Sequence, residues 1–216
     1  MELLTTGITF FQKGGIVMYV LLLCSLFVFS IGIERAMYFR RMDSGRAFAR
    51  DFYLALANNK WQKAEQLADH ARGALADILF AVITKKPEAR KNPSAYMEIQ
   101  SGIALAKMRK RLYYLSVIVT MAPLLGLLGT ISGMITSFSV FNLESGQATA
   151  ITGGVGEALI ATAMGLCVAI ISLTVHAYFS QRIENIVTDM EQCFSMVETS
   201  GQKELYEAGS HDHPDD

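Results

Sequence analysis

The stretch "APLLGLLGTISGMI", residues 122–135, is uncharged and contains three glycines, one proline and two hydroxyl side chains. It lies within a longer run without Asp, Glu, Lys or Arg, which extends from Leu112 to Leu143. A helix needs about 20 apolar residues to cross a hydrocarbon core of about 30 Å. The run is therefore long enough to span a membrane. Its unusual feature is that small and hydroxyl-bearing residues take the place of large ones near its centre.

Two further runs of the same kind, Gly14–Ile33 and Ala158–Gln181, also reach the length of a membrane span. The whole chain has 216 residues, of which 51% are hydrophobic and only 18% charged. Such a composition is typical of membrane proteins. We predict an all-α membrane protein with three transmembrane helices, the second and third of which extend far into the cytoplasm.

The basic residues predict the orientation of the three spans. Of the 19 Lys and Arg residues, 16 lie between Arg35 and Arg111, whereas the connection between the second and third spans has none. Loops rich in Lys and Arg stay in the cytoplasm. We therefore expect a multi-pass membrane protein with its N-terminus outside and its C-terminus in the cytoplasm.

Apolar spacing and turn residues divide the chain further. Phe48, Phe52 and Leu56 recur at helical spacing, "ANNKW" (57–61) is a plausible turn between two short helices, and a second break contains Pro87 and Pro93. The second span is expected to continue a helix that starts at about Ser94. The predicted segments are, in order, an interfacial helix or frayed terminus at 1–13, a transmembrane helix at 14–33, a cytoplasmic helical segment at 34–111, a transmembrane helix at 112–141, a short periplasmic loop at 142–156, a transmembrane helix at 157–181, and a cytoplasmic helix extension with an acidic tail at 182–216.

Small residues gather on one face of the second span and one face of the third, since residues in a helix are about 100° apart. Close helix packing in lipid explains such faces. A narrow passage lined by hydroxyls would also explain them if several chains presented these faces inward. Pro123 adds a carbonyl that lacks its helical donor. The residues assigned to helix packing are Gly126, Gly129, Gly133, Ala161, Gly165 and Pro123.

Hydroxyls and one carboxyl form the candidate proton pathway. Glu157 opens the third span, where the N-terminus of a helix favours an anion, and this placement alone would also explain the residue. No Asp, Glu, Lys or Arg lies near the middle of any span. Because hydroxyls do not change charge near neutral pH, a proton pathway here needs a carboxylate from a partner helix. The candidate pathway residues are Thr130, Thr162, Glu157, Ser137 and Ser172.

Other functional classes find little support in the sequence. Its three scattered cysteines do not form a disulfide or metal pattern. The stretch "TGGVG" lacks the lysine of a phosphate loop, and no catalytic set is visible. His211 and His213 lie in an acidic tail that reads as unstructured rather than metal-binding. We therefore predict no enzyme activity, no cofactor, no metal and, with a net charge of −1, no nucleic-acid partner.

Three stretches together resemble the ExbB/TolQ/MotA proton-channel family, specifically its three-span ExbB/TolQ branch. They are "GGIVMYVLLLCSLFVFSIGIERAMYFRR", "APLLGLLGTISGMITSF" and "ITGGVGEALIATAMGLCVAI". Many relatives have proline where this chain has Val20 and Ile171. Neither difference removes a polar group, although the bending of the first and third spans is then expected to differ.

The resemblance implies a homopentamer around a pair of one-span partners of the ExbD/TolR type, which supply an intramembrane Asp. Such a motor uses the proton motive force to energise a TonB/TolA-type protein that reaches the outer membrane. By motif position, Thr130 and Thr162 match hydroxyls that line the pore, and Glu157 matches an acidic residue at the start of the third span. The resemblance leaves open whether siderophore or vitamin uptake, envelope integrity or gliding is energised. A non-conducting membrane scaffold remains the alternative.

Overall fold

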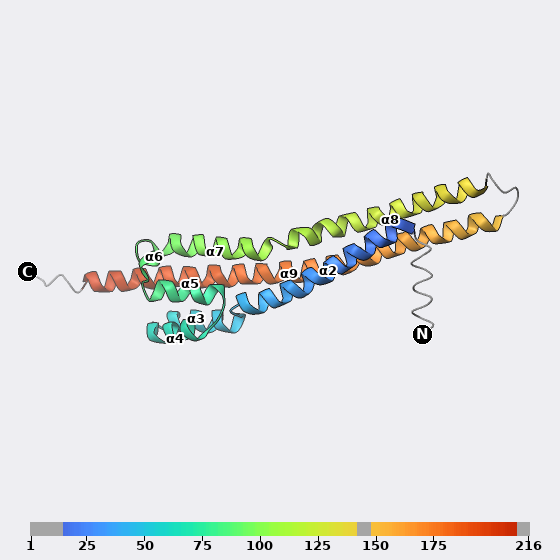
Figure 1. Ribbon diagram of the computed structural model, residues 1–216. Helices are drawn as coiled ribbons and strands as arrows, with labels where there is room; N and C mark the ends of the chain where they lie inside the picture. The colour runs from blue at the N-terminus through green and yellow to red at the C-terminus, as the bar shows by residue number, and fades with distance from the viewer. Residues whose placement is uncertain (1–14, 142–147, 211–216) are drawn as a thin grey trace, which may run out of the picture. The chain divides into compact units, whose positions relative to one another are not determined.

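The computed structural model describes residues 15–141 and 148–210, and all regular structure in these ranges is helical (Figure 1). The side chains of residues 139–141, 148–153, 157 and 202–210 are outside this description. The interfacial helix expected at 1–13 and the end of the acidic tail, 211–216, also lie outside the described residues. The fold class is confirmed as all-helical.

The chain divides into two compact units, which we describe separately. The first comprises Met1–Glu34 and Arg111–Phe179, and the second comprises Arg35–Lys110 and Ser180–Asp216. The long helices α2 and α9 contribute residues to both units.

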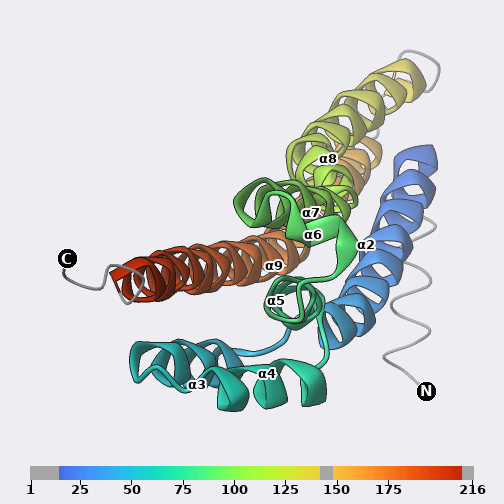
Figure 2. The ribbon, with the colours of Figure 1, turned by 90° about the vertical axis from the view of Figure 1, so that its left-hand side faces the viewer.

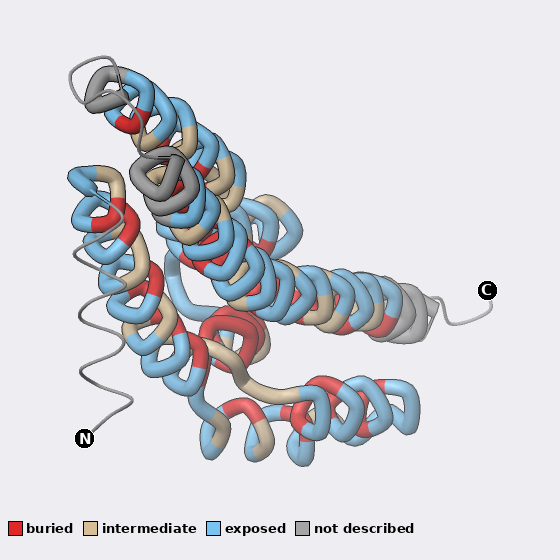
Figure 3. Tube along the Cα trace, turned by 90° about the vertical axis from the view of Figure 1, so that its right-hand side faces the viewer, coloured by how far each residue is buried: buried red, intermediate tan, exposed pale blue. Residues whose placement is uncertain are grey.

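The first unit contains the membrane-spanning helices. It takes residues from α2 (Gly15–Met42), α8 (Leu112–Phe141) and α9 (Ala148–Ser210), and all three helices are long and apolar enough to cross a membrane. Figure 3 shows exposed residues along much of the length of these helices. Many of them are large and apolar, such as Leu23 (66% exposed) and Leu124 (64%). Outward-facing apolar side chains are what a helix in lipid requires. The prediction of three helices long and apolar enough to span a membrane is therefore confirmed.

Two helix boundaries differ from the sequence predictions. α9 begins at Ala148, so residues 148–156, which we expected to be loop, are helical. The glycines there each cost about 1 kcal/mol relative to alanine. At a membrane surface this cost is offset because a helix satisfies every backbone polar group internally. In addition, a turn at Lys110–Arg111 separates α7 (Pro93–Arg109) from α8, where we expected one continuous helix.

The second unit contains five more helices together with the later parts of α2 and α9. Figure 2 shows α3 and α4 side by side, and α4 in turn contacts α5. Besides α7, the helices are α3 (Arg46–Ala57), α4 (Trp61–His70), α5 (Ala74–Ile83) and the single turn α6 (Pro87–Arg90). α5 is apolar nearly throughout and supplies the centre of the core, where Leu79 is fully buried together with Phe52 of α3 and Met97 of α7.

Turn residues explain why these helices are short. The predicted "ANNKW" turn is confirmed, with Asn59 in the left-handed region at φ 58°. Gly73 breaks the chain again at φ 122°, which the sequence analysis did not identify. A side chain at Gly73 would also lie 2.8 Å from the Met42 carbonyl oxygen. The proline-rich break is confirmed: Pro93 opens α7, and the Asn92 side chain accepts a hydrogen bond from the Ala95 N–H at 3.1 Å.

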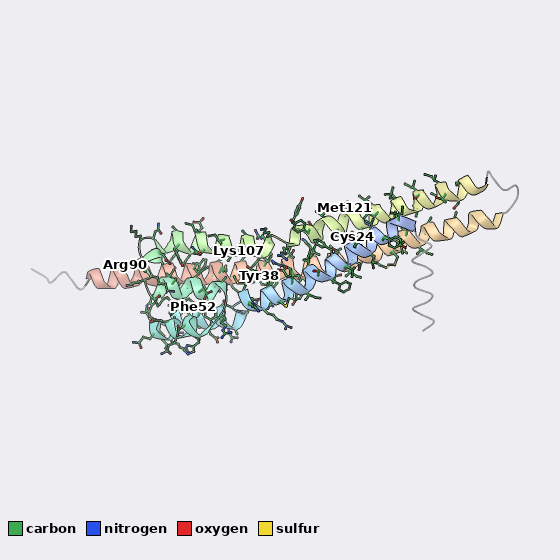
Figure 4. All side chains as sticks on the ribbon, viewed as in Figure 1. Cys24, Tyr38, Phe52, Arg90, Lys107 and Met121 are labelled. Atoms are coloured by element: carbon green, nitrogen blue, oxygen red, sulfur yellow. The ribbon has the colours of Figure 1, made fainter. Side chains whose placement is uncertain are left out.

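Arg35 is a buried arginine that closes the end of α7. Its guanidinium donates hydrogen bonds to the carbonyl oxygens of Lys107 and Met108, each at 3.2 Å. It also stacks on the Tyr38 ring at 4.5 Å, and the side chain is only 4% exposed. Tyr38 and Lys107 are labelled in Figure 4. The last carbonyls of a helix lack helical donors and attract cations. Arg35 therefore satisfies the end of α7 next to the turn that separates it from α8.

Cys193 is buried in the second unit beside a group of charged residues. Its thiol donates to the Ala49 carbonyl oxygen at 3.5 Å and is 1% exposed. Burial raises the pKa of this thiol to about 12, and the nearby Asp189 carboxylate adds to the rise. Burial also raises the pKa of the Asp189 carboxyl itself, although Arg46 and Arg182 oppose that shift.

We expect Cys193 to be inert to alkylation in the folded protein. At pH 9 about one thiol in a thousand with a pKa near 12 is ionised, against about three-quarters for an ordinary cysteine with a pKa of about 8.5. In a Cys24→Ala/Cys167→Ala background, iodoacetamide should modify Cys193 at least about 100-fold more slowly than a cysteine placed at the exposed neighbour by Gln192→Cys with Cys193→Ala. Mass spectrometry of the time course measures both rates. Similar rates would show that the site opens readily.

Candidate functional site

The candidate site is the contact between α8 and α9 in the first unit, which we call the α8–α9 seam. Small residues from both helices meet in it, and the two helices run side by side in Figure 1. Its buried members are Gly126, Gly129, Ala158, Ala161 and Gly165, with Gly133 half-buried. Five of the six helix-packing residues predicted from the sequence are thus brought together within a single chain, and Pro123 is the exception.

The glycines bring the two backbones into direct contact. A Cβ atom added to Gly165 would lie 2.6 Å from the Ala122 carbonyl oxygen and 3.0 Å from the Gly126 Cα. One added to Gly126 would lie 3.0 Å from the Ala161 carbonyl oxygen, and one added to Gly133 would lie 3.1 Å from the Ala158 Cβ. Because the nearest atoms at Gly165 and Gly126 are backbone, they cannot rotate away. Glycine is therefore required at these two positions for the helices to approach this closely.

Two hydroxyls of α9 form hydrogen bonds across the seam. Thr162 Oγ1 donates to the Gly126 carbonyl oxygen at 3.1 Å, and Ser172 Oγ donates to the Leu115 carbonyl oxygen at 3.1 Å. Thr162 is half-buried, whereas Ser172 is fully buried. The sequence placed both hydroxyls on the small face but did not identify their acceptors. For Thr162 the available signal was a glycine on the facing helix, because a glycine lets the two backbones approach closely. No such signal marks Leu115, the acceptor for Ser172.

The hydroxyls of α8 are bonded within their own helix. Thr130 Oγ1 donates to the Leu127 carbonyl oxygen at 2.7 Å and remains half-exposed. Ser137 Oγ donates to the Gly133 carbonyl oxygen at 2.8 Å and is only 7% exposed, facing Gly154 of α9. Pro123 is half-buried within α8 and leaves one carbonyl of that helix without its usual donor. Of the four predicted pathway hydroxyls, Thr130 and Thr162 are therefore the two that remain partly exposed, whereas Ser137 and Ser172 are buried.

The seam carries no charge of its own among the residues whose side chains the structure describes. The nearest ion pair within the unit joins Arg111 and Glu34 at 2.9 Å, at the ends of the spans. Glu157 lies in the helical part of α9, but its side chain is outside the description. Across the described ranges, no group of His, Cys, Asp and Glu is placed to hold a metal ion. The seam can pack helices and offer hydroxyls to water, but its hydroxyls cannot take up a proton near neutral pH.

These observations define a class: a membrane protein with three long apolar helices, two of which meet through glycines and hydroxyls and carry no Asp, Glu, Lys or Arg among the described residues of their contact. A family model described as the MotA/TolQ/ExbB proton channel family matches residues 66–192. The chain belongs to this family.

Individual relatives agree with the family match. The chain is similar to the ExbB-like 1 protein of Synechocystis sp., with 36% identity over 76% of this chain and 67% of the relative. It is also similar to the ExbB-like 3 protein of the same organism, with 30% identity over 95% of this chain and 97% of the relative. The Tol-Pal system protein TolQ of Pseudomonas aeruginosa is 32% identical over 44% of this chain and 45% of the relative. The family indicated by the motifs is confirmed, and it is a family of proton channels rather than a class of enzymes.

Proposed function

We propose that this chain is the channel subunit of an inner-membrane motor that uses the proton motive force to energise transport at the outer membrane. The observation that carries the proposal is the α8–α9 seam, where Thr130 and Thr162 are partly exposed but no Asp, Glu, Lys or Arg is found among the described side chains. Such a seam can line a proton pathway only when another chain supplies the group that takes up and releases the proton.

The proposed complex is a homopentamer around a one-span partner of the ExbD/TolR type. The partner's Asp would titrate next to Thr130 and Thr162, and Glu157 would lie at the periplasmic entrance. Ser137 and Ser172 are nearly or fully buried in helix contacts, so a role for them in lining the pore requires the helices to separate. A TonB/TolA-type protein would receive the resulting movement. The proposed membrane is the inner membrane, with residues 34–111 and 182–216 in the cytoplasm because the basic residues concentrate in the first of these segments.

An ExbB-type role is favoured over a TolQ-type role by the extent of the similarity. The ExbB-like 3 match covers 95% of this chain, whereas the TolQ match covers 44%. We therefore place envelope integrity and gliding second to outer-membrane transport.

One observation favours a second candidate function, a non-conducting scaffold. Thr162 and Ser172 both form hydrogen bonds between helices of the same chain, which a packing role alone would explain. A scaffold would not need a titratable partner in its centre.

Native mass spectrometry of the complex distinguishes the two functions. The protein is expressed together with its neighbouring genes and extracted gently, and we expect a pentamer of this chain that retains a small one-span partner. A closed homo-oligomer that never recruits such a partner would contradict the motor and support the scaffold, because its pore would lack a proton carrier. Identification of the partner in the same spectrum would indicate which process is energised.

A further inference from the structure

A groove lies between α7 and the later part of α9, entirely within the second unit. We call it the α7–α9 groove, and it has a volume of about 290 Å³. This is close to the lower end of the range of about 300–1,000 Å³ typical of ligand pockets, so it has room for one or two side chains. It is lined by Ser94, Met97, Glu98, Ser101, Leu105, Val187, Met190, Glu191, Phe194 and Glu198.

The floor of the groove is apolar. Leu105, Val187 and Phe194 are only half-buried, and beneath them Met97 and Met190 are 1% and 2% exposed. Methionine side chains adapt readily to the shape of an apolar guest. The half-buried leucine, valine and phenylalanine would lose further contact with water if an apolar side chain entered, which favours binding.

The walls of the groove are acidic. Glu98, Glu191 and Glu198 are all exposed, and no lysine or arginine is among the lining residues. Within the described part of the chain none of the three forms an ion pair, in contrast to Glu184, which pairs with Arg109 at 3.4 Å. Carboxylates of one sign around a low-dielectric floor create a negative potential that attracts cations.

We propose that the α7–α9 groove docks a basic amphipathic peptide segment of a partner protein, with an apolar side chain on the floor and Lys or Arg against the three carboxylates. The acidic walls repel anionic lipid headgroups and nucleic acid. Charge complementarity therefore selects a peptide among the possible occupants. The proposal concerns docking alone and does not depend on proton conduction.

A separate basic peptide brings lysines and arginines that have no other contacts to lose. Within this chain, by contrast, several cations already have partners. Arg35 caps α7, Lys86 lies over the Phe80 ring at 5.2 Å, and Arg182 pairs with Asp43 at 2.9 Å. A partner that supplies its own lysines and arginines can bind the groove without breaking these contacts within the chain.

The test uses the full chain in nanodiscs of phosphatidylcholine, a lipid without net charge. The probe is a fluorescein-labelled dodecapeptide of alternating arginine and leucine residues with one phenylalanine, and the reference peptide has glutamate in place of arginine. Binding is measured by fluorescence anisotropy at two salt concentrations. The triple variant Glu98→Gln/Glu191→Gln/Glu198→Gln removes the charge of the groove. The matched control Glu65→Gln/Asp69→Asn/Glu88→Gln removes the same charge from exposed positions outside it.

We expect the groove variant to weaken binding of the arginine peptide about tenfold, the control to change it by less than about twofold, and the glutamate peptide not to bind. Phe194→Ala should weaken binding by about fivefold without changing its salt dependence, since it removes apolar contact but no charge. Equal losses in the groove and control variants would overturn the proposal, because attraction would then be a property of net charge alone. The proposal would also be overturned if the groove variant bound the peptide normally but formed a smaller oligomer. The groove would then be a contact between copies of this chain.

Discussion

Gly165→Leu is expected to abolish folding of the protein in the membrane. Even a Cβ atom at this position would lie 2.6 Å from the Ala122 carbonyl oxygen and 3.0 Å from the Gly126 Cα. Both neighbours are backbone atoms, so relief requires α8 and α9 to move apart along the whole α8–α9 seam. That movement would remove both hydrogen bonds across the seam as well as its packing. We expect no monodisperse peak in fluorescence-detected size-exclusion chromatography.

The smaller change Gly165→Ala provides a graded test of the same contact. Overpacking typically costs about 1–3 kcal/mol, so the melting temperature in detergent should fall by about 5 °C. Gly156→Ala is the matched control on the same helix, since a Cβ atom there meets nothing within 4 Å. This control should leave the melting temperature unchanged or raise it slightly, because alanine favours helix over glycine. A normal yield and melting temperature for Gly165→Leu would show that the backbones are farther apart than the structure places them.

Thr162→Val is expected to remove energised transport while the complex still assembles. Valine keeps the shape of threonine but has no hydroxyl to offer to water or to a partner's carboxyl group. Losing the hydrogen bond to the Gly126 carbonyl oxygen should cost only about 0.6 kcal/mol in a membrane. Under the proposed function, proton-driven activity should fall at least about tenfold. This factor corresponds to an activation free energy raised by about 1.4 kcal/mol, the contribution of one hydrogen bond in the conducting state.

Two control variants make this result specific. Thr162→Ser restores the hydroxyl and should retain most of the activity. Thr174→Val removes an exposed hydroxyl of the same helix that donates only to the Ile170 carbonyl oxygen at 2.8 Å, and it should be silent. Proton flux into liposomes that contain the complex with its partner, measured with a pH-sensitive dye, reports the activity. Full flux through Thr162→Val would remove this residue from the proton pathway and favour the scaffold.

The parts of the fold that follow from chain-wide patterns could be predicted from the sequence. Uncharged runs of sufficient length identify the three spans, and small residues at helical spacing identify the two faces that meet in the seam. Local exceptions could not be predicted in the same way. The helical start of α9 at Ala148 was missed because three glycines in "TGGVG" resemble a loop when the surrounding membrane is not considered.

The partners of individual polar side chains were the least predictable feature of the site. Arg35 reads in sequence as part of a basic anchor at the membrane surface, yet it caps a helix more than seventy residues away in the chain. Ser172 reads as a possible pore hydroxyl, yet it is bonded to the Leu115 carbonyl oxygen in the contact between two helices. Both cases depend on which backbone carbonyl lies opposite the side chain. Helical periodicity gives the face of a residue but not the axial position of the neighbouring helix.

The two hydrogen bonds across the seam fix that axial position. Their donors, Thr162 and Ser172, are ten residues apart on α9, and their acceptors, Leu115 and Gly126, are eleven apart on α8. At about 1.5 Å per residue both spacings are close to 15 Å, so the two bonds fit a single register of antiparallel helices. Sliding by one turn, about 5.4 Å, would break both bonds and shift each glycine away from its close neighbour. The two helices are therefore expected to move together as one rigid body. Movement in a working complex is then expected between neighbouring helix pairs rather than within a pair.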